Sequence, residues 1–290
     1  MHLSIKISRL SNLLFFAKKT DRTDLIKFDL RKYLSDEKFN LSFYGRSEDK
    51  IWKQIEKIIG KECAKEIKKS FIPLNSIFAS HWRKAFNHLF LWKQYFQNNQ
   101  SLFQQVILEL KKLSGIKNFT ISKIPIYLIS DPTNNDKEIN AWFSWTPKES
   151  FIVVEIPLGL KAPNNFFPLA VLAHEFFHLM LKENKNLFLK IANITKENDK
   201  LFTKLAEGMP SRIFLEELLI SSFIPEGYLS EKYFNTKVSS PVSKPKDLLR
   251  WRKFVAFKLY PATKKYVNSN RQIDENYLKD LIGVVKQNIK

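Results

Sequence analysis

The sequence feature that most constrains this chain is a pair of histidines four residues apart, His174 and His178, with Glu175 directly after the first. The residues around them, 166–181, are almost all apolar, which predicts a helix that is buried on most sides. Burying two histidines and a carboxylate costs several kcal/mol unless these groups are paired or bind a metal. The sequence therefore predicts a paired or metal-binding group on a buried helix.

The spacing of these three residues suits a catalytic zinc ion. Residues four apart lie on the same face of a helix, so His174 and His178 can offer two imidazole nitrogens to one ion. Glu175 points to the side of this pair, where its carboxylate can take a proton from a water on the metal. A structural zinc site is disfavoured, because such sites usually use several cysteines and the chain has only Cys63. The alternative is a pair of core histidines that neighbouring carbonyl groups satisfy by hydrogen bonds.

The His-Glu-x-x-His pattern at residues 174–178 resembles the active-site motif of the zincin metallopeptidases. It is most similar to the gluzincins, in which a glutamate from a later helix is the third ligand. The metzincin extension is absent, because residues 179–184 read LMLKEN and contain neither the required Gly nor a third His. The resemblance covers roughly residues 124–228. It implies a zinc-dependent peptidase that hydrolyses peptide bonds with a metal-activated water and with Glu175 as the general base.

The resemblance also implies a sheet beside the active-site helix and a peptide or protein substrate. In that family an edge strand pairs through its backbone with the extended substrate. Residues 139–144 and residues 151–157 are the two candidates for this strand, and the sequence does not distinguish between them. Tyr228 can supply a hydroxyl to the oxyanion, as Tyr or His does in related sites, or it can simply pack.

Four glutamates after His178 are candidates for the third ligand: Glu197, Glu207, Glu216 and Glu217. We favour the strongly apolar helix at residues 213–220, where a carboxylate has to be paired or ligating. Within it, Glu216 has Arg212 as a salt-bridge partner one turn away, so Glu217 is the preferred ligand. Ser221, one turn after Glu217, can hydrogen-bond the ligating carboxylate.

The other two glutamates remain alternatives on the basis of the resemblance. Glu207 precedes Gly208, which is similar to the Glu-Gly start of the ligand helix in several of these families. Glu197 has 18 residues between it and His178, a spacing familiar from gluzincin aminopeptidases. Residues 195–200 are polar, however, and are typical of a solvated stretch.

The chain as a whole predicts a mostly helical α+β fold with a small sheet and a zincin-like core. We expect a mostly helical region at 1–120, the metallopeptidase core at 121–231, and a linker with basic C-terminal helices at 232–290. Strands are expected at 3–7, 124–129, 139–145 and 151–156. Helices are expected at 48–69, 75–97, 101–113, 166–181, 213–220, 247–259 and 274–286, and residues 25–34 fit either a strand or a short helix.

The net charge of +19 is unevenly distributed, at +12 for residues 1–120, −2 for 121–230 and +9 for 231–290. Basic flanks can bind nucleic acid, although the Lys- and Asn-rich composition also fits solvated lysines without a partner. The alternative function is therefore a nucleic-acid- or partner-binding regulatory protein with an inactive or auxiliary zincin core. The single cysteine, the lack of a signal-peptide pattern and the lack of a long apolar run predict a cytoplasmic protein without a transmembrane segment.

Overall fold

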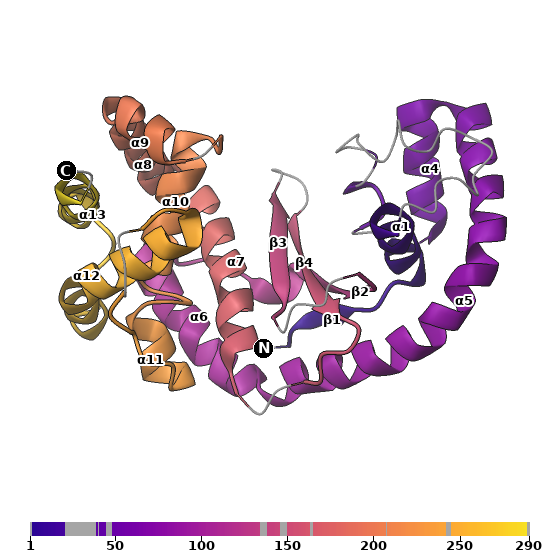
Figure 1. Cartoon of the computed structure of the whole chain (residues 1–290), viewed down its shortest axis with the longest axis horizontal. Helices are drawn as coiled ribbons and strands as arrows, with labels where there is room; N and C mark the ends of the chain where they lie inside the picture. Colours follow the sequence, from indigo (N-terminus) through magenta and orange to yellow (C-terminus); the bar gives the residue numbers. More distant parts are fainter. Residues whose placement is uncertain are drawn as a thin grey trace. The chain divides into compact units, whose positions relative to one another are not determined.

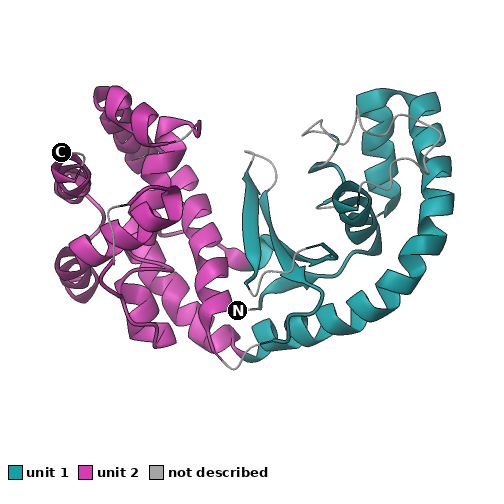
Figure 2. Ribbon diagram, in the orientation of Figure 1, with its two compact units in different colours: residues 1–98, 122–162 teal, residues 99–121, 163–290 magenta. Residues whose placement is uncertain are grey.

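The computed structural model describes residues 2–20, 39, 41–44, 48–133, 138–145, 150–162, 165–206, 208–241 and 245–288 (Figure 1). Residues 25–34 and Glu207 lie outside these described residues. The chain divides into two compact units (Figure 2). Unit 1 comprises residues 1–98 and 122–162, and unit 2 comprises residues 99–121 and 163–290. Each unit therefore combines segments that are distant in the sequence.

Unit 1 contains a four-stranded sheet in the order β1-β2-β4-β3. Its strands are β1 (Ser4–Lys6), β2 (Pro125–Asp131), β3 (Asn140–Trp145) and β4 (Ser150–Pro157). Strands β1, β2 and β4 are parallel, whereas β3 is antiparallel to β4. The interior strands β2 and β4 are almost entirely buried, as their continuous runs of Ile, Leu and Val predict. Strand β3 lies at an edge and is half-buried, so β4 is excluded as the edge strand considered above.

A buried asparagine attaches the first helix, α1 (Arg9–Lys19), to this sheet. The side-chain amide of Asn12 donates to the carbonyl oxygen of Leu128 at 3.1 Å, and its oxygen accepts from the backbone N–H of Ser130 at 2.8 Å. Both partners belong to β2. Because the backbone groups of β2 and the amide of Asn12 satisfy one another, the polar side chain can be buried without an energetic penalty.

The next two helices end differently from the prediction. Helix α4 (Glu48–Ile59) stops at Gly60, and α5 runs without interruption over Lys61–Asn98, so the expected break after residue 69 was wrong. Gly60 has a φ of 85°, a left-handed conformation that glycine adopts most readily and that ends a helix. Pro73 lies inside α5, where the flanking residues Phe71 and Leu74 are buried and hold the helix together.

Unit 2 is entirely helical among its described residues. Its helices are α6 (Gln100–Ser114), α7 (Phe167–Glu183), α8 (Lys185–Glu197), α9 (Asp199–Leu205), α10 (Ser211–Ser221), α11 (Tyr228–Phe234), α12 (Leu248–Asn268) and α13 (Glu275–Gln287). A short 3₁₀ helix, η2 (Ile121–Lys123), lies where the units meet in the sequence. The fold is thus the mostly helical α+β architecture that the sequence predicted.

Helix α7 forms the centre of unit 2. It contacts α6, α8, α10 and α11, and nearly every residue from Pro168 to Leu181 is buried. The ring of Phe176 packs against Phe103 of α6, with the ring centroids 5.6 Å apart. Because α7 is covered on all sides, its polar side chains must find partners inside the unit.

The two C-terminal helices, α12 and α13, begin where the sequence predicted, but α12 ends later than predicted. Asp247 and Asp274 cap the N-termini of α12 and α13, each accepting a hydrogen bond from a backbone N–H three residues later. Helix α12 continues through Pro261 to Asn268, beyond the expected end at residue 259. In the described part of the chain, no helix is long and apolar enough to cross a membrane.

Two glycine-to-alanine substitutions are expected to change stability in opposite directions. Gly60→Ala should lower the free energy of unfolding by about 1 kcal/mol, because alanine is strained at a φ of 85°. Gly283→Ala, inside α13, should raise it by about 0.5–1 kcal/mol, because alanine favours the helix. Neither added methyl group would meet a described atom within 4 Å. Urea unfolding followed by circular dichroism measures both values, and effects of the same sign would contradict this account of Gly60.

Candidate metal centre

Three side chains from two helices of unit 2 converge on one point. His174 and His178 come from α7, Glu217 comes from α10, and one potential ligand atom of each lies within 4.8 Å of the other two. The Nε2 atoms of the two histidines are 3.1 Å apart. Glu217 Oε1 lies 3.0 Å from Nε2 of His178, and Oε2 lies 3.2 Å from Nε2 of His174. Ligand atoms around a tetrahedral zinc ion are about 3.3 Å apart, so a small shift would fit these three to a metal.

The Nδ1 atoms of both histidines point away from the cluster, toward a backbone carbonyl group and a carboxylate. Nδ1 of His174 lies 3.2 Å from the carbonyl oxygen of Ile224, which can only accept, so Nδ1 carries the proton and Nε2 presents its lone pair to the cluster. Nδ1 of His178 lies 3.7 Å from Oε2 of Glu216. Backbone carbonyls and carboxylates in these positions orient metal-ligating histidines and increase their basicity. The outer contacts therefore suit two histidine ligands.

Glu216 is engaged by two cations on the side away from the cluster. Lys182 Nζ lies 2.7 Å from Oε2 and 2.9 Å from Oε1, and Arg212 Nε lies 3.3 Å from Oε1. The salt bridge predicted between Glu216 and Arg212 is confirmed, whereas Lys182 was not foreseen. Burial raises the pKa of Glu216, but its contacts with His178 and Lys182 outweigh this effect and lower it. Glu216 is therefore an ionised group that holds His178 from outside the cluster.

The structure describes only one of the two remaining candidates for the third ligand, Glu197 and Glu207. Glu197 is exposed at the end of α8 and is not part of the cluster. Glu207 lies outside the described residues. Among the described glutamates, only Glu217 offers an oxygen atom to both histidines.

Arg252, on α12, is a residue of this site that the sequence analysis missed. Its Nη1 atom lies 3.5 Å from Oε2 of Glu217, and its Nη2 atom lies 3.1 Å from Oε1 of Glu226. Its Nε–H donates to the hydroxyl of Ser221 at 2.7 Å. Among the described residues Ser221 forms no hydrogen bond with Glu217; Arg252 contacts both of them instead. The only sequence signal is a basic residue next to the buried Trp251 on α12.

Tyr228 does not join the cluster. Its side chain is buried, and its hydroxyl donates to the side-chain oxygen of Asn268 at 3.2 Å. The packing alternative for Tyr228 is thus the one that the contacts support. The turn before it contributes through its backbone instead, because Ile224 supplies the carbonyl group that faces His174.

Glu175 lies beside the cluster with a carboxylate that has no hydrogen bond or ion pair to any described residue. The residue is 7% exposed, and burial raises its pKa, although the neighbouring His174 and His178 oppose this shift. A carboxylate with a raised pKa and unused oxygen atoms is suited both to accept and to donate a proton.

A proton holds the cluster together when no cation is bound. Burial alone would lower the pKa of His178, but its contacts with Glu216 and Glu217 raise it to about 9. Burial raises the pKa of Glu217, and the two histidines reverse this effect and bring it well below its usual range. At neutral pH, His178 is therefore protonated and Glu217 is ionised, so a cation must displace a proton to bind.

The geometry predicts one divalent cation per chain, bound through His174, His178 and Glu217. Alanine at any of these three positions should abolish stoichiometric binding, because two remaining ligands hold a zinc ion poorly. Glu216→Gln should weaken binding by about 10- to 100-fold, since it removes the charge that orients His178. Glu197→Gln is the matched control and should bind like the wild type. The metal content of each variant is measured after dialysis. One metal ion per chain in Glu217→Ala would contradict the assignment of Glu217 as a ligand.

Metal loading at pH 7 should release about one proton per ion, because the pKa of His178 is about 9 before binding. The apparent affinity should therefore rise about tenfold per pH unit up to about pH 9 and then level off. Calorimetric titration in two buffers with different enthalpies of ionisation measures the proton count. A pH-independent affinity between pH 6 and pH 8 would contradict this protonation state.

Comparison with known proteins adds no further constraint on this site. No protein-family model, no curated protein and no solved structure matches the chain. The case for a metal centre therefore rests on the positions and environments of the residues themselves.

Proposed function

We propose that the chain is a zinc-dependent peptidase. The observation that carries this proposal is the unpaired carboxylate of Glu175 next to the convergent Nε2 atoms of His174 and His178 and the carboxylate of Glu217. A metal site that served only stability would need the three ligands alone. It would not need an additional buried carboxylate that has no partner among the described residues. A hydrolytic site needs this group as a proton acceptor.

The donor set supports zinc as the ion. Two imidazole nitrogens and one carboxylate oxygen form the three-ligand arrangement typical of catalytic zinc sites, which leave one position for water or substrate. When bound, zinc would polarise the scissile carbonyl group and lower the pKa of a water molecule. A site made of carboxylates and carbonyls alone would instead favour magnesium or calcium.

The chain's own residues divide the remaining tasks. His174, His178 and Glu217 would hold the ion, while Glu216 and the carbonyl group of Ile224 fix the orientation of the two imidazoles. A carboxylate oxygen of Glu175 would take the proton of the attacking water and deliver it to the nitrogen of the leaving amine. The pKa of Glu175, raised by burial, favours both steps, because the group can hold the proton between them.

The proposed peptide substrate rests on the sequence resemblance, and the proposed location in the cell rests on the cysteine content. A peptide or protein substrate follows from the resemblance of residues 174–178 to the gluzincins. A reducing compartment such as the cytoplasm fits the single cysteine, Cys63, which is free.

Glu175→Gln should retain one metal ion per chain but lower kcat/KM for peptide hydrolysis by about 100- to 10,000-fold, because glutamine cannot accept a proton. Glu183→Gln is the matched control, since Glu183 is exposed at the end of the same helix. Mass spectrometry of a random peptide library incubated with zinc-loaded protein measures cleavage. A zinc-loaded wild type that cuts no peptide, or undiminished cleavage by Glu175→Gln, would refute the proposal.

A further inference from the structure

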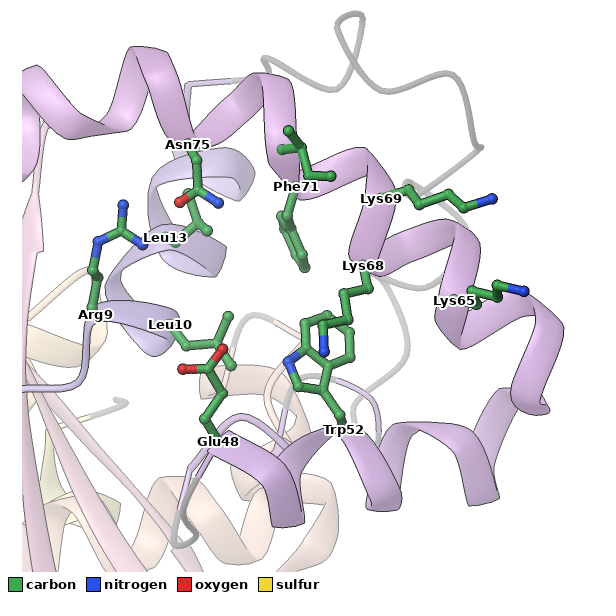
Figure 3. Close-up of a pocket in the computed structure, with 11 residues that line it drawn as sticks. Arg9, Leu10, Leu13, Glu48, Trp52, Lys65, Lys68, Lys69, Phe71 and Asn75 are labelled. Atoms are coloured by element: carbon green, nitrogen blue, oxygen red, sulfur yellow. The ribbon is translucent and has the colours of Figure 1, made fainter.

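Unit 1 contains a cavity of about 390 Å³ among helices α1, α4 and α5 (Figure 3). Its walls are apolar and buried where the three helices meet: Leu10 and Leu13 come from α1, Trp52 from α4, and Phe71 from α5. The volume lies within the range of about 300–1,000 Å³ that small-molecule sites occupy. This cavity shares no residue with the metal cluster, which belongs to unit 2.

Two buried polar atoms in the cavity wall have no hydrogen-bond partner among the described residues: Nε1 of Trp52 and Oδ1 of Asn75. Trp52 is 8% exposed, and its Nε1 lies on the side of the ring that faces Leu10 and Glu48 (Figure 3). A buried polar group without a hydrogen-bond partner destabilises the fold, because it has lost its contact with water. A ligand that offers an acceptor to the indole N–H and a donor to the amide oxygen would remove this destabilisation.

Four basic residues line the cavity, Arg9, Lys65, Lys68 and Lys69, of which Lys65 and Lys69 extend away from Trp52 (Figure 3). Lys69 pairs with Glu66, whereas Arg9, Lys65 and Lys68 form no ion pair with a residue that the structure describes. Lys68 lies against the Trp52 ring, with its Nζ atom 5.5 Å from the ring centroid. Glu48 is the one acidic residue among those that line the cavity. The balance of charge therefore favours an anionic ligand.

We propose that this cavity binds a nucleoside phosphate. A nucleoside carries both donors and acceptors on a largely flat apolar body, which matches the apolar wall and the two unsatisfied groups, Trp52 Nε1 and Asn75 Oδ1. Its phosphate would lie toward Lys68, which extends over the Trp52 ring. A fatty acid has an anionic head and an apolar body, but it would leave both buried polar atoms without a partner. Free nucleotides and a single-stranded nucleic acid share this chemistry, and the test below distinguishes these two sources.

Calorimetric titration of the full chain at low salt tests the proposal with five probes: adenosine monophosphate, adenosine, inorganic phosphate, a six-residue oligoadenylate and decanoate. Adenosine monophosphate should bind at least tenfold more tightly than adenosine or phosphate alone, because only it engages both the apolar wall and the cations. Tighter binding of oligoadenylate than of the mononucleotide would identify a nucleic-acid strand as the source, and the reverse order would identify a free nucleotide.

Substitutions of residues that line the cavity test whether the nucleotide binds there. Trp52→Phe keeps an aromatic ring, although a smaller one, and removes the N–H, so it should weaken nucleotide binding by about 3- to 10-fold. Lys68→Met should weaken it by about 3- to 10-fold and reduce the preference over adenosine, and this exposed position should not affect folding. Lys57→Met, at an exposed position of α4 outside the cavity, is the matched control. Tighter binding of decanoate than of the nucleotide, or wild-type affinity in both cavity variants, would overturn the proposal.

Discussion

The cost of burying ionisable groups inside unit 2 is the constraint on which the rest of this site depends. Helix α7 is covered on all sides, yet it carries two histidines and a glutamate in its middle. Each histidine is accommodated because its two nitrogens have separate partners, one in the cluster and one outside it. The fold of unit 2 therefore has to bring α10 and the turn after it against one face of α7, since these elements supply the partners.

Acidic and basic side chains alternate along the path that leads from the histidines to the surroundings of the cluster. Glu217 faces the histidines on one side and Arg252 on the other, and Arg252 continues to Glu226. On the opposite side, Glu216 connects His178 to Lys182. Such networks are stable in a low-dielectric interior only when every member is satisfied. Glu175 is the exception, because its carboxylate has no such contact to the described residues, and under the proposed function it is the group that accepts the proton of the attacking water.

The two units offer different kinds of binding chemistry. Unit 2 concentrates nitrogen and carboxylate ligands on rigid helices, which hold a catalytic group more accurately than loops do. Unit 1 has an apolar cavity lined by basic residues and by two polar atoms without a hydrogen-bond partner among the described residues. The excess of positive charge in residues 1–120 could have been no more than a solvated surface. Four of the cations in this region line one cavity, which gives part of this charge a specific location.

The sequence by itself determined the features that depend on local order. The spacing of His174 and His178 required a shared helix face, continuous Ile and Val runs required the buried strands, and Asp247 and Asp274 required helix starts. The apolar pattern around residues 213–220 already favoured Glu217 as the residue that meets the histidines. Only the tertiary structure decided that α5 and α12 continue through proline, and that Arg252 contacts both Ser221 and Glu217. These outcomes depend on packing between segments far apart in the chain, and local pattern carries no information about such contacts.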